Sequence, residues 1–253
     1  MSYTVPAKRW EFAQERELLY QQNKATQVVG ERGQLSLVTH AVAKSRYVED
    51  LLSAFGARAS IDDCVLEVGS GAHGIIWKWP ASNRVALDPL AVFFAANFPF
   101  LQSTDDIWIV QAKGETIPFP DGRFDFVFSD NVLDHTESPE YVLREVRRVL
   151  KPSGVFYFVV DVHHPIWNLA CKTYNLLFRF GMKINVKAFP HHPFHFTQSD
   201  MSALFSACGL DIKFLRTGAD NTVGGIMEQS MKKTFYKNRR LELIATRNGG
   251  SAR

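Results

Sequence analysis

A glycine-rich loop flanked by two carboxylates is the part of this sequence best suited to chemistry. The loop runs from Gly69 to Gly74, with glycine at its first, third and sixth positions, and it follows a short apolar run at 64–68. Glu67 lies two residues before the first glycine, and Asp88 lies nineteen residues after it. Glycine lets the backbone turn tightly and approach a ligand closely. The spacing therefore indicates a nucleotide-type ligand site, with the alternative that the glycines serve packing alone.

The charge beside the loop separates two ligand classes that fit this spacing. A nicotinamide or flavin dinucleotide presents a pyrophosphate to such a loop, whereas S-adenosylmethionine presents an ammonium and a sulfonium. Asp88 could bind ribose hydroxyls in either ligand. A carboxylate at Glu67 would repel a pyrophosphate at short range and attract the two cations. The charges favour S-adenosylmethionine, with the alternative that Glu67 accepts hydrogen bonds from local backbone amides.

Histidines form the second group of candidates, because imidazole titrates near neutral pH and can take a proton from an acceptor. Seven of the eight histidines lie in the glycine loop, after the predicted strands 124–129 and 154–162, or in residues 163–196. The candidates for a general base of an oxygen or nitrogen acceptor are His135, His163, His164 and His195. The alternative is that most of these side chains only line the rim of the site.

A metal site is a further alternative for His191, His192 and His195. Imidazoles this close in sequence could bind one metal ion. However, no Asp or Glu lies within 189–198, and the two prolines of this segment fix an irregular backbone. We therefore predict no metal site.

These residues are positioned by an alternation of predicted strands and helices. Continuous apolar strands separated by helices are typical of a parallel sheet covered on both faces. The predicted strands are 64–68, 84–88, 107–111, 124–129, 154–162, 210–215 and 241–246. The predicted helices include 7–24, 35–55, 140–150 and one that ends at Cys208. Thr197 and Asp200 are expected to form a capping box at the start of that last helix.

The predicted fold class is α/β: a doubly wound, Rossmann-like, mostly parallel sheet with an antiparallel last strand. Residues 1–60 are predicted to form an N-terminal helical cap, and residues 61–253 the ligand-binding domain. Periodicity is lost over 163–196, just after the fifth strand, so we predict an inserted lid there. Its apolar stretch 166–180 indicates a helix packed over the end of the sheet. The alternative is a transient contact with a membrane surface.

Length and composition are typical of one folded α/β protein. The 253 residues are 46% hydrophobic and 22% charged, which excludes a disordered chain. The 29 basic and 26 acidic residues give a net charge of +3, which is too balanced to predict a nucleic-acid partner. Three widely spaced cysteines, an N-terminus without a secretion signal and the lack of a long apolar run predict a soluble cytoplasmic protein. The oligomeric state stays open.

Four motifs resemble those of class I S-adenosylmethionine-dependent methyltransferases. Val65–Gly71 resembles the first motif and Val85–Pro89 the second. Gly114–Asn131 and the helix-to-strand turn within Glu145–Gly154 resemble stretches of the ubiquinone/menaquinone-type subfamily. The motifs occur in the family's order and spacing over about residues 64–162. The resemblance implies S-adenosylmethionine as the cofactor.

The resemblance also implies residues that bind this cofactor. Glu67 and the glycine-loop backbone would meet its methionine part, and Asp88 would bind its ribose. Asp130 and Asn131 would line the sulfonium side. The implied set is Glu67, Gly69, Ser70, Gly71, His73, Asp88, Pro89, Gly114, Glu115, Asp130 and Asn131.

Two residues depart from the family pattern. His73 stands where the family usually has its third glycine, with Gly74 one place later, which indicates a longer or re-aimed loop. Lys113 stands where many relatives carry an acidic residue for the adenine amino group. This weakens the implied role of Glu115 beside that amino group.

The resemblance implies a methyltransferase, and we expect it to act on an oxygen or nitrogen of a small-molecule or glycan-linked acceptor, with a carbon atom as the less favoured alternative. The segments beginning at Trp10 and His192 are also similar, more weakly, to methyltransferases of bacterial polysaccharide clusters. Two alternatives remain: a nicotinamide-dependent oxidoreductase, and a non-catalytic module that binds S-adenosylmethionine. Glu67 counts against the first, and the retained motif carboxylates count against the second.

Overall fold

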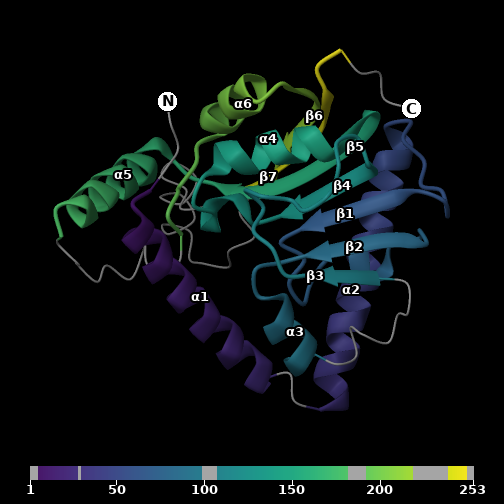
Figure 1. Ribbon diagram of the computed structural model, residues 1–253, viewed down its shortest axis with the longest axis horizontal. Helices are drawn as coiled ribbons and strands as arrows, with labels where there is room; N and C mark the ends of the chain where they lie inside the picture. Colours follow the sequence, from purple (N-terminus) through teal and green to yellow (C-terminus); the bar gives the residue numbers. More distant parts are fainter. Residues whose placement is uncertain (1–4, 28–29, 99–106, 182–191, 219–238, 250–253) are drawn as a thin grey trace, which may run out of the picture.

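The described part of the protein contains a seven-stranded sheet with the order β3-β2-β1-β4-β5-β7-β6 (Figure 1). The computed structural model describes residues 5–27, 30–98, 107–181, 192–218 and 239–249. The strands are β1 (Cys64–Val68), β2 (Asn83–Leu87), β3 (Ile107–Val110), β4 (Phe124–Asp130), β5 (Leu150–Val162), β6 (Leu210–Thr217) and β7 (Arg239–Arg247). Neighbours from β3 to β5 pair in parallel, and β7 runs antiparallel to β5 and β6. The predicted fold class is confirmed.

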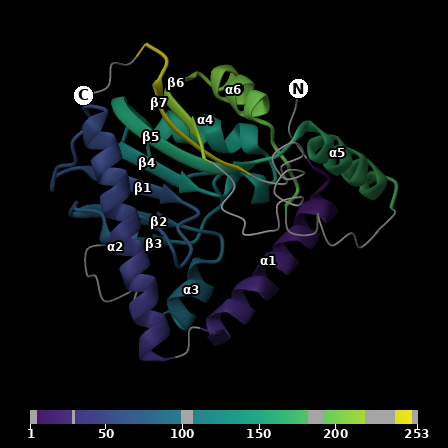
Figure 2. The same ribbon diagram turned by 180° about the vertical axis from the view of Figure 1, so that it is seen from behind.

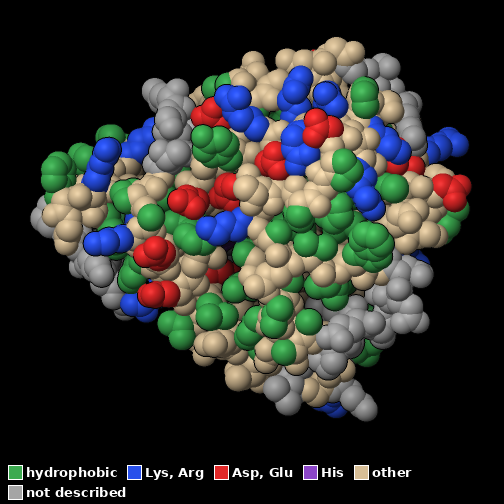
Figure 3. Space-filling view, viewed as in Figure 1, with side chains coloured by type: hydrophobic (Ala, Val, Ile, Leu, Met, Phe, Trp, Pro, Cys, Tyr) green, Lys and Arg blue, Asp and Glu red, His purple; other side chains and the backbone are tan. Residues whose placement is uncertain are grey.

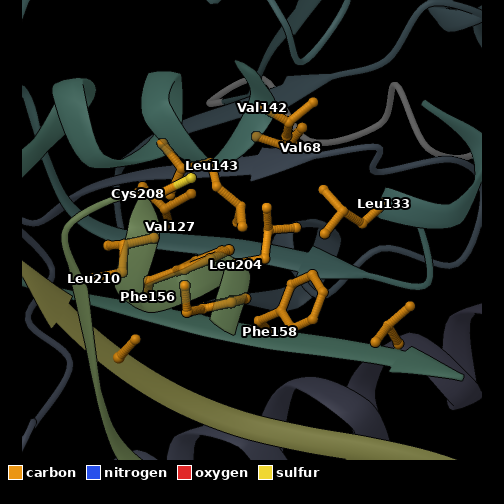
Figure 4. Packing of buried hydrophobic residues seen from close by; sticks show 14 of the residues in the cluster. Val68, Val127, Leu133, Val142, Leu143, Phe156, Phe158, Leu204, Cys208 and Leu210 are labelled. Carbon is orange, nitrogen blue, oxygen red and sulfur yellow. The ribbon is translucent and has the colours of Figure 1, made fainter. Parts of the chain in front are cut away.

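Helices cover both faces of the sheet, as continuous apolar strands require. The helices α4 (Pro139–Val149) and α6 (Gln198–Ala207) pack on one face, and α2 (Glu31–Ala54) packs on the other (Figures 1 and 2). Along β1, Leu66 and Val68 belong to the cluster beneath α4 and α6 (Figure 4), whereas Val65 belongs to the cluster beneath α2. A one-residue shift in register would exchange these sets, so burial of both faces fixes the strand position.

The helices α1 (Ala7–Gln27) and α5 (Pro165–Arg179) pack together near the carboxyl ends of the parallel strands (Figures 1 and 2). Phe12 of α1 lies against Phe178 of α5, with ring centroids 5.6 Å apart. The buried Arg9 places its guanidinium 5.3 Å from the Tyr174 ring centroid and donates a hydrogen bond to Asn175 Oδ1 at 3.1 Å. These contacts compensate for burial of the charge, so Arg9 holds α1 against α5.

The two N-terminal helices have different surroundings. Ala41, Val48 and Leu52 of α2 are buried in the same cluster as the sheet residue Val65. In α1, Arg9 and Ala13 are the buried residues, and that helix packs on α5 and the strand ends instead. The helix α1 therefore fits the description of a separate cap, whereas α2 is part of the packing around the sheet. The predicted boundary between cap and domain at residue 60 stays a proposal.

Some observed elements differ from the predicted ones. The helix α2 begins at Glu31, before the predicted start at 35. Residues 151–154, expected as a turn, belong to β5, because a register shift between Phe124 and Phe126 lets Leu150 pair with Phe124. Part of the predicted lid is the regular helix α5, and α3 (Ala91–Asn97) was not predicted. The capping box of Thr197 and Asp200 is confirmed.

Charged side chains of both signs are interspersed on the face shown in Figure 3. This arrangement agrees with the balanced composition, which gives a net charge of only +3. None of the helices in the described ranges is long and apolar enough to cross a membrane.

Candidate functional site

A cavity of about 550 Å³ lies between the carboxyl ends of β1, β2 and β4 and the helix α1. Its position is the one where ligands bind in open parallel sheets. All residues of the implied cofactor set line this cavity: Glu67, Gly69, Ser70, Gly71, His73, Asp88, Pro89, Gly114, Glu115, Asp130 and Asn131. Segments distant in sequence thus converge at one place, as the motif order predicts.

The glycine loop is shaped by the protein's own packing. Gly69 has a φ of +72°, and a Cβ there would collide with the side chain of Val132. A Cβ on Gly74 would lie 2.6 Å from Glu67 Oε2. The third glycine is therefore needed at position 74, where the Glu67 side chain passes, and His73 can occupy the preceding position. This contact explains the shifted glycine spacing.

The carboxylate of Asp88 is fixed at the end of β2. Its Oδ2 accepts a hydrogen bond from the Gly71 backbone N–H at 3.0 Å, and its Oδ1 accepts one from the Leu90 N–H at 2.7 Å. The side chain is almost fully buried, and burial raises its pKa to about 6 although both hydrogen bonds lower it. Asp88 therefore joins the glycine loop to the segment after β2 and presents a preoriented carboxylate to the cavity.

Glu67 lies at the end of β1 and has two environments. Its Oε2 accepts a hydrogen bond from the Ile76 backbone N–H at 2.8 Å, which is the local role that the sequence left as the alternative. The residue also lines the cavity. Burial raises the pKa of Glu67 to about 7, partly opposed by the positive charge of Lys44. The two roles are compatible, because a carboxylate has acceptor sites beyond this hydrogen bond.

Lys44 of α2 brings a positive charge into the same part of the cavity. Its Nζ lies 2.7 Å from Asp130 Oδ2 and donates a hydrogen bond to the His73 carbonyl oxygen at 3.0 Å. Arg240 lies 3.0 Å from the same Asp130 oxygen. Burial raises the pKa of Asp130, but these two cations outweigh it and hold the pKa below its ordinary value. Asp130 therefore remains ionised.

Shortly after β4, Asp134 lies beside two imidazoles, those of His135 and His192. His192 Nδ1 is 2.7 Å from Asp134 Oδ2, and the ring centroids of His135 and His192 are 4.4 Å apart. His135 and His192 line the cavity, whereas Asp134 is buried behind them. Burial raises the pKa of Asp134, but the neighbouring histidine charges and the His192 hydrogen bond outweigh it and lower the pKa.

This chain matches known methyltransferases in both sequence and fold. A family model described as a methyltransferase domain matches residues 66–158. The matched part of the chain is thus similar to methyltransferase domains, and its parallel strands agree with that fold. One solved structure of similar fold, a geranyl diphosphate methyltransferase, is a complex with S-adenosylmethionine; its TM-score is 0.55 at 13% identity, over 80% of this chain and 85% of that one.

The chain is 31% identical over 126 residues to an uncharacterised protein of Mycobacterium tuberculosis. This match covers 46% of this chain and 42% of that protein. It is also 44% identical over 120 residues to a sarcosine/dimethylglycine N-methyltransferase of Halorhodospira halochloris. This match covers 45% of this chain and 43% of that enzyme. These matches span less than half of either relative. The crystal structure of the YcgJ protein from Bacillus subtilis has a TM-score of 0.58 at 19% identity and covers 81% of this chain and 100% of that one.

Of the four predicted catalytic histidines, His135 lines the cavity and the other three do not. His163 and His195 are buried side by side, with ring centroids 4.3 Å apart. His164 caps α5, because its Nδ1 accepts a hydrogen bond from the Ile166 N–H at 3.3 Å. The turn after β5 lies outside the cavity lining: β5 continues through Val162, and the His163 N–H donates to the Phe196 carbonyl oxygen at 2.7 Å.

Several residues that line the cavity were not predicted from the sequence. The sequence indicates His192 only as one ligand of an alternative metal site, and it indicates no role for Lys44. The α1 residues that line the cavity are Trp10, Gln14, Glu17, Tyr20, Gln21 and Lys24. The helical spacing could have indicated Lys44, because it lies three residues after Ala41 and four before Val48, on the buried side of α2.

The structure also explains why a lysine stands at position 113, where many methyltransferases carry an acidic residue. Its Nζ lies 3.7 Å from the Trp10 ring centroid, so this lysine pairs with α1. Glu115 Oε1 accepts hydrogen bonds from the backbone N–H groups of Glu137 and Ser138, at 2.8 and 3.2 Å. Glu115 thus orders the segment that leads into α4, and its second oxygen is left for a ligand.

Proposed function

We propose that this chain transfers a methyl group from S-adenosylmethionine to an oxygen or nitrogen atom of a small-molecule or glycan-linked acceptor. One observation carries the proposal: a single cavity connects the glycine loop and Asp88 with the side chains of His135 and His192. Such a cavity can hold a cofactor and an acceptor against each other. Positioning two reactants is the main requirement of a displacement reaction.

The residues around the loop fit the cofactor. Each oxygen of Asp88 accepts one backbone hydrogen bond and keeps a lone pair for a ribose hydroxyl. Glu67 and Asp130 provide negative charge for the ammonium and the sulfonium, and Lys44 provides positive charge for the carboxylate of the methionine part. When bound, S-adenosylmethionine supplies a methyl group activated by the sulfonium.

The acceptor end suits a nucleophile that must lose a proton. His135 and His192 line the cavity, and the buried Asp134 lies beside both rings. Such groups can activate an O–H or N–H bond, whereas a carbon nucleophile needs a more acidic C–H bond. We therefore rank oxygen and nitrogen acceptors above carbon acceptors.

The two alternatives, a nicotinamide-dependent oxidoreductase and a non-catalytic module, differ in the ligand that they bind and in whether they turn over an acceptor. Two carboxylates, Glu67 and Asp130, lie in the cavity beside the loop and count against a pyrophosphate ligand. A non-catalytic module would bind S-adenosylmethionine but would turn over no acceptor. The test is incubation with methyl-labelled S-adenosylmethionine and panels of hydroxyl- and amine-bearing acceptors, with release of S-adenosylhomocysteine as the readout. Label transfer supports the proposal, and tight NADP⁺ binding without any binding of S-adenosylhomocysteine would overturn it.

A further inference from the structure

Three potential metal ligands meet at the acceptor end of the cavity. Asp134 and His135 belong to the short 3-10 helix η3 (Leu133–His135), and His192 comes from the start of a described segment far along the chain. One ligand atom of each residue lies within 4.8 Å of the others. His192 Nδ1 and His135 Nε2 lie 2.7 and 4.0 Å from Asp134 Oδ2. The two imidazoles thus already lie around the carboxylate of Asp134.

The buried carboxylate of Asp134 provides an independent indication of a missing partner. Its side chain is only 2% exposed, and within the described ranges its Oδ1 has no hydrogen-bond partner. A buried oxygen of an ionised carboxylate without a partner is costly. The neighbouring His135 Nδ1 also has none in those ranges, and Glu17 Oε2 lies 3.7 Å from it. A cation among these groups would satisfy Asp134 Oδ1, and it would leave His135 Nδ1 facing Glu17.

We propose that Asp134, His135 and His192 bind one divalent first-row transition metal ion, such as Zn²⁺, Mn²⁺ or Co²⁺. Two imidazoles and one carboxylate suit these ions better than Mg²⁺ or Ca²⁺, which prefer all-oxygen sites. Ligand atoms around such an ion lie about 3.3 Å apart, from metal–ligand distances near 2.1 Å. The distance of 2.7 Å between His192 Nδ1 and Asp134 Oδ2 must therefore increase when the metal binds. Glu17 is positioned to support His135.

The site has a direct consequence for the acceptor. Because His135 and His192 line the cavity, a metal held by them would offer its open coordination positions to that cavity. A ligand with an oxygen donor, such as a hydroxyl or a carboxylate, would occupy those positions. A hydroxyl bound there would lose its proton more readily. This consequence rests on the proposed function, whereas metal binding itself does not.

Metal binding can be measured without any acceptor. The full chain is treated with EDTA, exchanged into buffer and titrated with CoCl₂ while visible absorption is recorded, followed by competition with ZnCl₂. We expect a saturable spectrum at one Co²⁺ per chain, which Zn²⁺ abolishes. His192→Ala and Asp134→Asn should weaken Co²⁺ binding by about 100-fold or more, whereas His40→Ala, which removes a histidine of α2 outside the cluster, should leave it unchanged.

Two outcomes would overturn the metal site: no saturable Co²⁺ spectrum in the wild-type chain, or an equally strong one in His192→Ala. Circular dichroism checks that each variant is folded, and His192→Ala remains informative if Asp134→Asn does not fold, because the His192 side chain is 36% exposed. S-adenosylhomocysteine binding is measured on the same metal-free samples. Its presence without Co²⁺ binding would refute the metal site alone, and its absence with Co²⁺ binding would refute the proposed function alone.

Discussion

Lys44 Nζ and Asp130 Oδ2 lie 2.7 Å apart and join the middle of α2 to the carboxyl end of β4. This ion pair faces the cavity that contains the glycine loop. Lys44 also lowers the pKa of the neighbouring Glu67. A helix expected to form part of a separate cap thus supplies a charge to the cavity beside the glycine loop.

The first prediction concerns this lysine. Lys44→Ala should weaken binding of S-adenosylhomocysteine about tenfold, because a charge-assisted contact to the carboxylate of its methionine part is lost. Binding of 5′-methylthioadenosine, which lacks that carboxylate and the ammonium, should change little. Calorimetry with both ligands provides the matched comparison. An equal loss for both would show that Lys44 acts on the cavity as a whole.

The second prediction is a pH dependence of cofactor binding. Burial raises the pKa of Glu67 to about 7, so below that pH the carboxyl is protonated in the ligand-free protein. An ammonium group must then displace the proton, and affinity for S-adenosylhomocysteine should fall as pH drops from about 8 to about 6, by up to about tenfold per unit. Glu67→Gln should remove this slope. A wild-type affinity that is constant over this range would exclude contact between Glu67 and the ligand's ammonium.

The third prediction concerns stability. The folded-state pKa of Glu67, about 7, lies above its ordinary value of 4.5, so folding favours the protonated carboxyl. This contribution to stability is fully present below about pH 4.5 and is lost as pH rises through about 7. Glu67→Gln can retain the hydrogen bond from the Ile76 N–H, so it should melt a few degrees, about 4 °C, higher than the wild type at pH 8. At pH 5 the difference should be small. A lower melting temperature at both pH values would contradict this account.

The fourth prediction separates the candidate histidines. His135→Ala should lower turnover by about 100-fold or more and leave affinity for S-adenosylmethionine nearly unchanged, because His135 lines the cavity and is proposed to contact the acceptor. His164→Ala is the matched control, since that ring caps α5 outside the cavity lining. Turnover numbers for both variants are the measurement. Near-normal turnover in His135→Ala would leave positioning as the main catalytic contribution.

Local spacing in the sequence was sufficient for the sheet and the cofactor side. Continuous apolar strands predicted a covered parallel sheet, and the residues just after β1, β2 and β4 had to meet at its carboxyl edge. Gly69 and Asp88 could therefore be placed from spacing, whereas the place of Asp130 beside the cofactor came from the family resemblance. All three line the observed cavity.

The acceptor side depended on contacts that spacing does not encode. His192 meets Asp134 across 58 positions in the chain, and nothing in the local pattern around either residue indicates that pairing. His163 and His195 carry the same chemistry, but their rings pack against each other, tilted, where β5 ends. The packing of α1 on α5 through Arg9 likewise determines which α1 residues reach the cavity.

The most direct test of the central claim is a calorimetric titration of S-adenosylhomocysteine into the wild-type chain and into Asp88→Ala. Asp88 is held by the N–H groups of Gly71 and Leu90 and is assigned to the ribose hydroxyls. We predict saturable binding at one ligand per chain. The substitution should weaken it by about 1.5–3 kcal/mol, or more than tenfold. A folded Asp88→Ala protein that binds as tightly as the wild type, or a wild-type chain that binds no S-adenosylhomocysteine, would contradict the account.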